Sequence, residues 1–412
     1  MCLFVAKLHH VARAIFDHAL ASVNPRPAVK RAVEDLDLAP TPIYSIAIGK
    51  AAVSMALGLE DALGEKLAGG VIVSTSLHQS TCWQSFAGGH PLPNESSLAA
   101  AEAAFGLLDR ANAEAATVIF LISGGGSAMI EWPVDNEITL GDLRAANQGL
   151  VSCGARIAEM NSVRRAFSAV KGSGLARRAP KAQQFTLIVS DTNPGDEASV
   201  ASGPTFDAPA DAPKAIEVVE HYHLDTVLPA SIMKVLRDSE VPAGKVSGSH
   251  LVLLDNDTAI DAARTKALEL GFGCEITADV CEQPIQDGCD LLLSAPSSAI
   301  SGGEFSCPVR GDGRGGRNLE TALRCAIALD KQAAHTVVLS AGTDGIDGNS
   351  PAAGAIADET TLQRARSLNL DASQYLARSD SYIFFEQLND LITTGPTGTN
   401  VRDLRILLRH SV

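Results

Sequence analysis

The sequence predicts an α/β protein with two different three-layer α/β/α domains, whose largely parallel sheets face each other across a cleft. Three observations support this fold class. Short apolar runs rich in β-branched residues alternate with longer segments of good helix formers in both halves of the chain. Most of these runs end at clusters of Gly, Ser, Asp or Asn, as expected for strands that helices cover on both faces. The length of 412 residues accommodates about two to three domains.

The expected elements follow from this alternation and from local start and stop signals. Ser96 or Ser97 supplies an N-cap for an alanine-rich helix, and Pro25 and Pro27 end the first helix. We expect strands at 44–48, 71–73, 118–122, 185–189, 251–254, 291–293 and 336–339, and a further strand after residue 304. We expect helices at 1–20, 51–63, 97–113, 143–160, 257–270 and 319–329.

A change in composition between Val227 and Ser249 predicts the domain boundary, because prolines and glycines interrupt the apolar pattern there. We expect an N-terminal Rossmann-like domain over residues 1–235 and a C-terminal α/β domain over 236–412. The first 20 residues are apolar at intervals but carry charged side chains between them. This pattern favours an amphipathic docking helix over a signal peptide. Residues 1–40 could pack on either domain.

Composition limits the partners. The net charge of −15 and the pI near 5.1 argue against nonspecific nucleic-acid binding, which needs a basic surface. No apolar run approaches the roughly 18 residues that a membrane span needs, so we expect no membrane partner. The eight cysteines form no C-x-x-C pair, which predicts reduced thiols in a cytoplasmic protein.

A glycine-rich loop follows the most apolar of the expected strands. Val118–Ile122 is unbroken and apolar, and Ser123, Gly124, Gly125, Gly126 and Ser127 come directly after it. Glycines let backbone N–H groups approach a ligand closely, and a helix that begins at the following residues attracts anions to its N-terminus. The loop therefore predicts a phosphate or carboxylate site. The alternative is a tight strand-to-helix connection without a ligand.

A second loop, Gly311–Gly316, fits the dinucleotide-binding pattern G-x-G-x-x-G and is the main argument for an NAD enzyme. We discount it because the acidic residue expected about 20 positions later is missing. Arg314 and Arg317 instead suit bidentate recognition of a phosphate or carboxylate. The phosphate-binding pattern G-x-x-x-x-G-K-[ST] is absent from the sequence, which excludes the P-loop architecture.

Lys50 and four aspartates are the remaining candidates for chemistry. Lys50 follows a buried strand at the start of a helix, where a cation is unfavourable unless an anion is also present. The alternative for Lys50 is a solvated side chain. Asp191, Asp196, Asp344 and Asp347 could hold Mg²⁺, although aspartates beside glycines are common in ordinary turns.

Taken together, these segments resemble the glycerate 2-kinase family, whose carboxyl-terminal part is called the MOFRL domain. The resemblance covers nearly the whole chain in order. It rests on I-G-K-A-A (48–52), G-G-H-P-L-P (88–93), L-I-S-G-G-G-S-A (121–128), V-K-G-S-G-L-A (170–176), S-D-T-N-P-G-D (190–196), A-S-G-P-T (201–205), S-G-G-E (301–304), G-R-G-G-R-N-L-E (313–320), A-G-T-D-G-I-D-G (341–348) and T-G-P-T-G-T-N-V-R-D-L-R (394–405). The chain departs from the family at Ser173, where a second glycine is usual, and at Thr192–Pro194.

The resemblance implies ATP-dependent phosphorylation of the 2-hydroxyl of D-glycerate to give 2-phosphoglycerate, with Mg²⁺. It also implies that Lys50 and Arg317 are essential cations. We expect the loop from Ser123 to Ser127 to cradle the phosphates of ATP, and expect Asp191 and Asp344 to contact Mg²⁺ or orient the attacking hydroxyl. Gly313, Gly315 and Gly316 are further candidates for cofactor binding.

Two alternatives stay open. The first is an NAD(P)-dependent hydroxypyruvate reductase, a label that some members of the family carry. The second is a non-catalytic two-domain protein that closes on a hydroxy acid. For the kinase we expect only small-molecule partners, D-glycerate and ATP, and a cytoplasmic monomer or homodimer.

Overall fold

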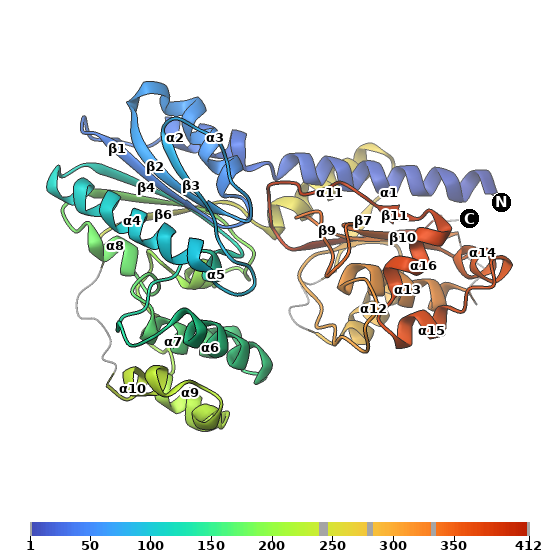
Figure 1. The fold of residues 1–412 in the computed structure, drawn as a ribbon. Helices are drawn as coiled ribbons and strands as arrows, with labels where there is room; N and C mark the ends of the chain where they lie inside the picture. The colour runs from blue at the N-terminus through green and yellow to red at the C-terminus, as the bar shows by residue number, and fades with distance from the viewer. Residues whose placement is uncertain (1, 239–245, 278–282, 331–334, 410–412) are drawn as a thin grey trace. The chain divides into compact units, whose positions relative to one another are not determined.

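The computed structural model describes residues 2–238, 246–277, 283–330 and 335–409, and the chain folds into two compact units (Figure 1). The central unit consists of Pro25–Leu254. The terminal unit consists of Met1–Asn24 and Asp255–Val412, so both ends of the chain belong to it. Each unit has its own sheet and its own apolar cores.

The central unit is built on a six-stranded sheet with the order β3-β2-β1-β4-β5-β6. All its neighbouring strands pair in parallel. This is the order of a doubly wound sheet, in which the direction of strand succession reverses between β1 and β4. The strands are β1 (Ile43–Ile48), β2 (Leu67–Ser74), β3 (Trp83–Ala87), β4 (Thr117–Ser123), β5 (Gln183–Val189) and β6 (Ser249–Leu254).

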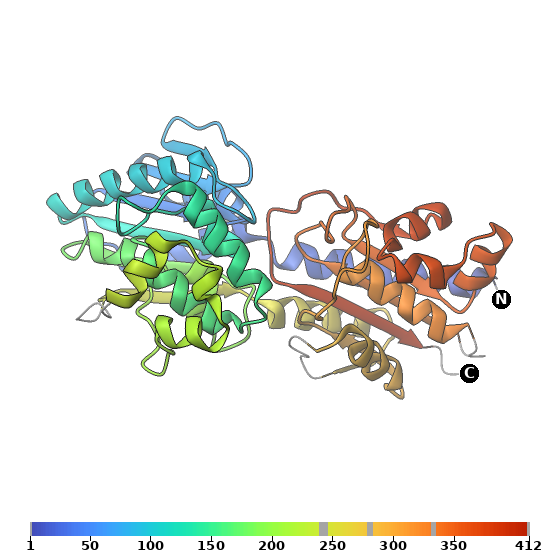
Figure 2. The same ribbon diagram turned by 60° about the horizontal axis from the view of Figure 1, so that its bottom comes forward.

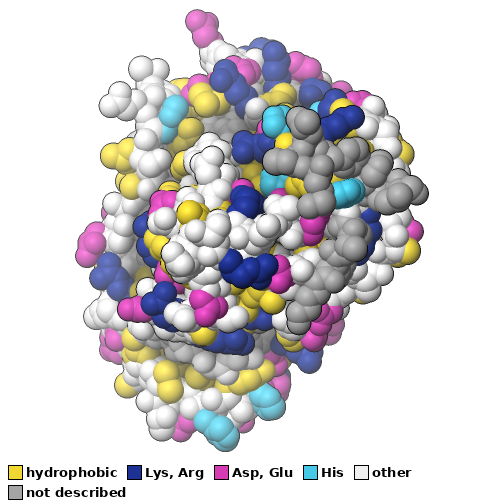
Figure 3. Space-filling view, turned by 90° about the vertical axis from the view of Figure 1, so that its right-hand side faces the viewer, with side chains coloured by type: hydrophobic (Ala, Val, Ile, Leu, Met, Phe, Trp, Pro, Cys, Tyr) yellow, Lys and Arg dark blue, Asp and Glu magenta, His cyan; other side chains and the backbone are white. Residues whose placement is uncertain are grey.

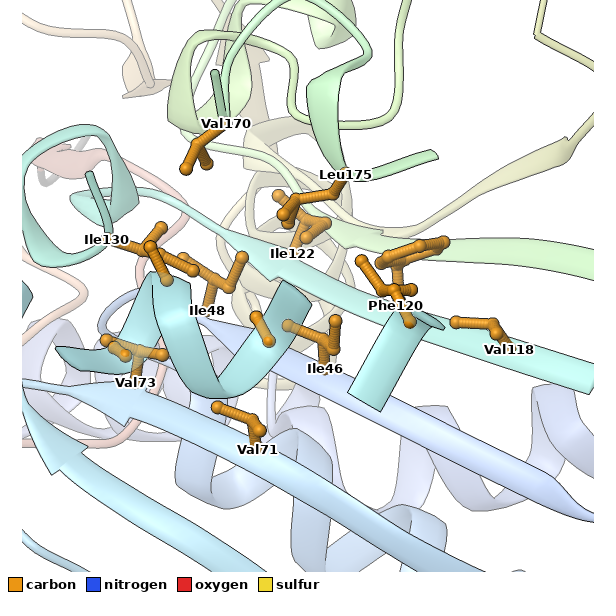
Figure 4. Packing of buried hydrophobic residues seen from close by; sticks show 14 of the residues in the cluster. Ile46, Ile48, Val71, Val73, Val118, Phe120, Ile122, Ile130, Val170 and Leu175 are labelled. Atoms are coloured by element: carbon orange, nitrogen blue, oxygen red, sulfur yellow. The ribbon is translucent and has the colours of Figure 1, made fainter. Parts of the chain in front are cut away.

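Helices cover both faces of this sheet (Figures 1 and 2). On one face, small and aliphatic residues of α4 pack on alternate residues of β1, β2 and β4, which Figure 4 shows from close by. α3 contacts β1, β2 and β4 from the other face, and α2 packs on α3. The helices near the sheet are α2 (Pro25–Glu34), α3 (Ala52–Leu63), α4 (Glu95–Ala113), α5 (Gly126–Met129) and α8 (Gly174–Arg178), with short 3₁₀ turns at Gly64–Lys66 and Glu197–Ser202.

Four further helices form a separate apolar cluster in the central unit, beyond the layer of α4, α5 and α8 (Figure 1). They are α6 (Leu140–Ser152), α7 (Ile157–Phe167), α9 (Ala215–His221) and α10 (Ala230–Asp238), with a 3₁₀ turn at Leu224–Thr226. The single helix expected over 143–160 is wrong. The chain breaks near Gly154, whose φ of 80° is not helical, and the Glu159 side chain accepts a hydrogen bond from the Arg156 backbone to start α7.

Two other local expectations also need correction in this unit. The N-cap of α4 is Asn94 rather than a serine, and Ser97 completes the capping box by accepting a hydrogen bond from the Asn94 backbone. β3 was not among the expected strands; it is a short edge strand with one buried residue, Trp83. Such a strand carries little apolar pattern.

The two-unit division places residues differently from the expected boundary after residue 235. β6 pairs in parallel with β5, so the central unit extends to Leu254. Residues 239–245, which form part of the compositional break, lie outside the described residues. At the other end, Met1–Asn24 belongs to the terminal unit, whereas the chain from Pro25 onward belongs to the central unit.

The terminal unit contains a second six-stranded sheet with the order β11-β10-β9-β12-β8-β7. The α/β class with two three-layer domains is confirmed, but pairing in this sheet is mixed. β12 lies antiparallel between β9 and β8, β10 runs antiparallel to β9 and β11, and β7 is parallel to β8. Buried apolar runs do not encode strand direction, so the sequence could not show this. The strands are β7 (Cys274–Ile276), β8 (Ser298–Ser301), β9 (Thr336–Gly342), β10 (Gly354–Asp358), β11 (Leu391–Ile392) and β12 (Asp403–Arg409).

Helices α1 and α11 cover one face of this sheet, and α12 to α16 lie on the other (Figures 1 and 2). α1 buries apolar residues spaced three and four apart, from Val5 to Ala19, and His9 hydrogen-bonds to Asp358 at 2.7 Å. It is the docking helix that its sequence predicts. The helices are α1 (Cys2–Ser22), α11 (Asn256–Glu269), α12 (Ile285–Ser294), α13 (Arg317–Leu329), α14 (Thr361–Ser367), α15 (Ala372–Ala377) and α16 (Ser381–Leu388).

Two strands expected in this unit are wrong. Leu291–Leu293 lies inside α12, because an apolar run of three residues is equally compatible with the buried side of a helix. The segment after Glu304 forms a single bridge between Ser306 and Pro284 rather than a strand. The strand of this region is instead β8, which begins at Ser298.

Within the described residues, no helix combines the length and hydrophobicity needed to cross a membrane. Six cysteines whose side chains are described are free thiols. On the face seen in Figure 3, basic and acidic side chains are intermixed.

The core of the central unit gives a first prediction. Phe120 is fully buried among β1, β4 and α4, so Phe120→Ala should lower the free energy of unfolding by about 3–5 kcal/mol. Phe86→Ala, at a partly buried position packed against the same core, is the matched control and should cost less. Urea unfolding followed by circular dichroism measures both, and an equal loss in the two variants would contradict this description of the core.

Candidate active site

The carboxyl ends of β1 and β4 are joined directly at the switch point of the central sheet. Lys50 N donates to the carbonyl of Gly124 at 2.9 Å. The Ser123 hydroxyl accepts from Ala51 N at 3.0 Å and donates to the carbonyl of Ile48 at 3.0 Å. Ligands of doubly wound sheets bind outside the strand ends at this point. The structure therefore brings together Lys50 and the glycine-rich loop, which lie more than 70 residues apart in sequence.

Close packing explains why glycines occur at these strand ends. Gly49 has a φ of 110°, and a Cβ there would overlap the Ser123 carbonyl and hydroxyl. A Cβ on Gly124 would overlap the Asp191 carboxylate, which follows β5. A Cβ on Gly125 would lie 3.2 Å from Lys50 Cγ and 3.5 Å from His90 Cδ2. Lys50, His90 and Asp191 therefore surround the same two glycines.

The expected helix after the glycine loop is too short to attract an anion through its dipole. α5 has four residues, Gly126–Met129, and a macrodipole needs a longer stack of aligned peptides. The loop is fixed instead by its neighbours. A Cβ on Gly126 would meet Ile48 Cγ2 at 2.7 Å and Ala201 Cβ at 2.8 Å, and the hydroxyls of Ser127 and Ser202 lie 2.8 Å apart.

Behind this loop lies a buried polar network that no sequence pattern predicted. Lys171 forms a fully buried ion pair with Glu131, and the Ser168 hydroxyl donates to the same carboxylate. Burial lowers the pKa of Lys171, although the Glu131 charge opposes this effect. Ser202 donates to Asn161 Oδ1 at 2.8 Å. The only sequence signal for Lys171 was its place in V-K-G-S-G-L-A, and Glu131 and Asn161 had none.

In the terminal unit, Arg317 is the first residue of α13 and is held by two carboxylates. Its Nε lies 2.5 Å from Asp403 Oδ2, and its Nη2 lies 2.6 Å from Glu304 Oε1. Burial alone lowers the pKa of Arg317, but the charges of Asp403 and Glu304 outweigh burial and raise it above its ordinary value. Asp403 is buried whereas Glu304 is one-third exposed. The contact with Glu304 is therefore the more accessible of the two to solvent.

The N-terminus of α13 is already occupied by a carboxylate from the same unit. Asp347 accepts from the backbone N–H of Asn318 at 3.1 Å and from that of Leu319 at 2.8 Å. The Asn318 side chain donates to Asp403 at 2.9 Å and accepts from Ser340 at 2.7 Å. A dinucleotide-binding loop needs these helical N–H groups for a pyrophosphate. Their use by Asp347 argues against the NAD interpretation of Gly311–Gly316.

Contacts with protein account for the glycines of this second loop. A Cβ on Gly313 would overlap the Arg378 carbonyl, one on Gly315 would lie 2.5 Å from Ser381 Oγ, and one on Gly316 would lie 2.5 Å from Asp347 Oδ1. The expected contribution of Gly313, Gly315 and Gly316 to cofactor binding stays a prediction.

The two expected metal-contacting aspartates belong to different units. Asp191 lies against the glycine loop of the central unit. Asp344 lies in the turn after β9, where its carboxylate accepts from Ile346 N at 3.2 Å, and this contact is typical of a turn. In the described parts of the chain, no group of three or more His, Cys, Asp or Glu residues is placed to hold a metal ion. The metal-binding roles of both residues stay predictions.

Comparison with known proteins gives matches along most of the chain. Residues 11–237 match a family described as a domain of unknown function, DUF4147, and residues 297–403 match the MOFRL family. A protein from Agrobacterium vitis that carries the name of a hydroxypyruvate reductase is 37% identical, over 97% of this chain and 94% of its own length. The D-glycerate 2-kinase of Thermotoga maritima is 34% identical, over 97% of this chain and 98% of its own length.

Solved structures agree with these sequence matches. The crystal structure of the glycerate kinase from Thermotoga maritima superposes with a TM-score of 0.86 at 32% identity, covering 98% of this chain and 100% of that chain. The PH0495 protein from Pyrococcus horikoshii superposes with a TM-score of 0.78 at 29% identity, covering 98% and 99% of the two chains.

The carboxylate at the start of α13 gives a prediction about pH. Burial raises the pKa of Asp347 from 3.8 to about 7, although the N–H groups of Asn318 and Leu319 oppose the shift. Between pH 4 and pH 7 the Asp347 carboxyl is ionised in the unfolded chain but still protonated in the folded chain. Folding must therefore take up a proton, which becomes less favourable as the pH rises, so the contribution of Asp347 to stability falls. Asp347→Asn removes this titration. The stability of the variant relative to the wild type should therefore rise from pH 4 to pH 7, by up to about 4 kcal/mol.

Urea unfolding at several pH values measures this difference. Asp312→Asn, at an exposed position of the same unit, is the control and should change stability little at any pH. Parallel stability curves for the wild type and Asp347→Asn would contradict the assignment.

Proposed function

This chain belongs to the glycerate 2-kinase family, and from that premise we propose that it transfers the γ-phosphoryl group of ATP to the 2-hydroxyl of D-glycerate. The products are 2-phospho-D-glycerate and ADP, and the reaction requires Mg²⁺. The relatives named glycerate kinase support a glycerate-phosphorylating enzyme. The nucleotide, the metal and the position of the new phosphate are our inference.

The observation that carries the proposal is the contact of Lys50 with the glycine loop. Its side chain lies against Gly125 at the switch point of a parallel sheet. A lysine is a compact cation that suits a phosphate oxygen. Glycines beside it leave room for phosphate oxygens to reach backbone N–H groups. We assign the ATP phosphates to the loop from Ser123 to Ser127 and to Lys50.

Phosphoryl transfer needs little covalent chemistry from the protein. The 2-hydroxyl oxygen forms a bond to the γ-phosphorus while the bond to the bridging β,γ-oxygen breaks, and ADP leaves with that electron pair. The hydroxyl proton passes to a carboxylate, for which we propose whichever of Asp191 and Asp344 does not contact Mg²⁺; Asp191 lies against Gly124. Catalysis comes mainly from positioning and charge stabilisation, which is the role of Lys50.

Carboxylate oxygens are suitable ligands for a hard cation. Asp191 and Asp344 are therefore our two candidates for contact with Mg²⁺. Mg²⁺ would neutralise charge on the phosphates. In the terminal unit we propose that Arg317 provides a further cation. Asp403 and the start of α13 fix its position.

The two alternatives have less support. A reductase that binds NAD through Gly311–Gly316 would have to displace Asp347 from the N–H groups of Asn318 and Leu319. A binding protein without activity has no counterpart among the relatives named glycerate kinase that are described above. Cytoplasmic location and the monomeric or dimeric state stay predictions.

One assay separates these functions. Purified protein with D-glycerate and Mg-ATP should release ADP, and phosphorus NMR should identify the 2-phospho isomer as the product. Omission of Mg²⁺ should stop the reaction. Oxidation of NADH by hydroxypyruvate without ATP would support the reductase instead, and binding of D-glycerate without ADP release would support the non-catalytic protein.

Replacement of Lys50 tests its proposed role. Lys50→Ala should lower kcat by at least about a hundredfold, because it removes a cation that stabilises developing charge. Lys181→Ala, at an exposed position of the same unit, is the control and should keep normal turnover. A near-normal rate for Lys50→Ala would remove this residue from the mechanism.

Replacement of Arg317 needs a variant that keeps the fold. Arg317→Ala removes the charge nearest to the buried Asp403, which Arg405 still approaches at 3.9 Å, and should cost about 1–3 kcal/mol of stability, so loss of activity alone would not be informative. Arg317→Lys keeps the charge but cannot reach Asp403 and Glu304 with one planar fork.

We expect Arg317→Lys to fold and to lose at least about tenfold in kcat. Arg366→Ala, which breaks an exposed ion pair with Asp330 in the same unit, should be fully active. Wild-type turnover by a folded Arg317→Lys would show that the guanidinium has no special role.

A further inference from the structure

Helix α7 carries a polar face whose positive charges the described residues do not balance. Asn161, Arg164 and Arg165 are spaced three and four positions apart, so they share one side of the helix. Within the described residues, neither arginine has a carboxylate within ion-pair distance. Including the Lys171–Glu131 pair behind them, this region holds three cations and one carboxylate in a chain of net charge −15.

Arg165 is the accessible member of this set. It is half-buried, and among the described residues its donors reach the carbonyls of Ser202, at 3.5 Å from Nε, and Ala198, at 3.3 Å from Nη2, and no other group. Both bonds are long for a charged donor. Burial lowers the pKa of Arg165, and no acidic group opposes the shift. A guanidinium has five N–H groups, so most of its hydrogen-bonding capacity is unused by the described residues.

Asn161 supplies a second, independent observation. Its side chain is 1% exposed. Its Oδ1 accepts from Ser202 Oγ at 2.8 Å and from Arg164 Nη1 at 3.5 Å. Its Nδ2 has no hydrogen-bond partner among the described residues. A buried amide donor without a partner costs about 1–3 kcal/mol, and a bound acceptor would recover that energy.

Ser202 links both residues to the glycine loop. It contacts Asn161 through its hydroxyl and Arg165 through its carbonyl, and its hydroxyl lies 2.8 Å from that of Ser127. Ser202 itself has a φ of 62°, which is unusual for a residue with a side chain. The donors of Arg165 and Asn161 therefore lie around one short segment, next to the loop that we assign to phosphates.

We propose that Arg165, together with Asn161, binds the carboxylate of the hydroxy-acid substrate. A planar guanidinium pairs with the two oxygens of a carboxylate through parallel hydrogen bonds, and the amide adds a neutral donor. Lys50 and the loop from Ser123 to Ser127 serve the phosphates, so the acid is held beside that loop, next to Ser202. The identification of D-glycerate as the source of this carboxylate rests on the proposed function.

The purely structural alternative is that Arg165 only fastens the segment from Ala198 to Ser202. Its side chain also packs along Gly172, where a Cβ would lie 3.1 Å from Arg165 Cγ. A structural role predicts loss of thermal stability without a selective effect on the acid. Substrate recognition predicts a selective rise in the KM for the acid.

Arg165→Lys tests the proposal, because it keeps the charge and most of the aliphatic stem but loses the fork. We expect the KM for D-glycerate to rise at least about tenfold, with the KM for ATP unchanged. The rise in melting temperature that D-glycerate produces without ATP should disappear. Asn161→Asp, an isosteric change, should act in the same direction because it places a carboxylate opposite the ligand. Arg178→Gln, which breaks an exposed ion pair with Asp109 in the same unit, should leave all these values unchanged.

Three results would overturn the proposal in a folded Arg165→Lys variant. A selective rise in the KM for ATP would assign the site to a nucleotide phosphate. Unchanged KM values for both substrates would leave only the structural role, as would a lower melting temperature with an unchanged response to D-glycerate.

The change in melting temperature on adding the acid distinguishes failure of this carboxylate site from failure of the proposed kinase activity. If the wild type releases no ADP, the kinase proposal fails. Stabilisation of the wild type by D-glycerate or malonate, lost in Arg165→Lys, would still support the carboxylate site. An absence of stabilisation by either acid would overturn it.

Discussion

The close approach of β1 and β4 at their carboxyl ends is the constraint on which the candidate site depends. Gly49 brings the backbone against the Ser123 carbonyl, and the Ser123 hydroxyl then bridges Ile48 and Ala51. A side chain at Gly49 would separate the two strand ends, and one at Gly124 would push away Asp191. The position of Lys50 beside Gly125 follows from these contacts. Gly49 and Gly124 therefore fix the positions of the Lys50 side chain, the Asp191 carboxylate and the backbone of the glycine loop relative to one another.

The partly buried arginines Arg317 and Arg165, one in each unit, differ in the groups that compensate their charge. Arg317 in the terminal unit is compensated by Asp403 and Glu304, so this region is electrically satisfied without a ligand. In the central unit, the hydrogen bonds of Arg165 to described residues all go to carbonyl oxygens. A guanidinium that is partly desolvated without a counterion is unfavourable until an anion arrives. This difference is the reason for placing the substrate acid in the central unit.

The sequence was informative wherever an apolar run ended in a polar cluster. It located the ends of β1 and β4, because short, mostly apolar runs that stop at Gly49 and at the loop from Ser123 to Ser127 leave few alternatives. It could not show that Lys50 and Gly125 are neighbours, since this depends on the strand order. Arg165 and Asn161 were missed because they lie on a helix whose start was misplaced and whose partner, Ser202, is about 40 residues away.

Local sequence patterns gave wrong or incomplete predictions where a residue's role depends on a contact with a distant part of the chain. Asp347 was a candidate for Mg²⁺, but its carboxylate accepts from the first N–H groups of α13. The G-x-G-x-x-G pattern ends at that same helix, and the position of Asp347 adds to the missing acidic residue a second reason to reject it as a dinucleotide loop. The direction of β10 and β12 was invisible for a related reason, since both faces of each strand are buried whichever way the strand runs.

The most direct test of the account is a crystal structure with a non-hydrolysable ATP analogue and D-glycerate. We predict phosphate oxygens within hydrogen-bonding distance of the backbone N–H groups of residues 124–127 and of Lys50 Nζ. Phosphates bound at residues 311–316, with the loop at 124–127 unoccupied, would contradict the central claim that the switch point of the first sheet is the phosphate site.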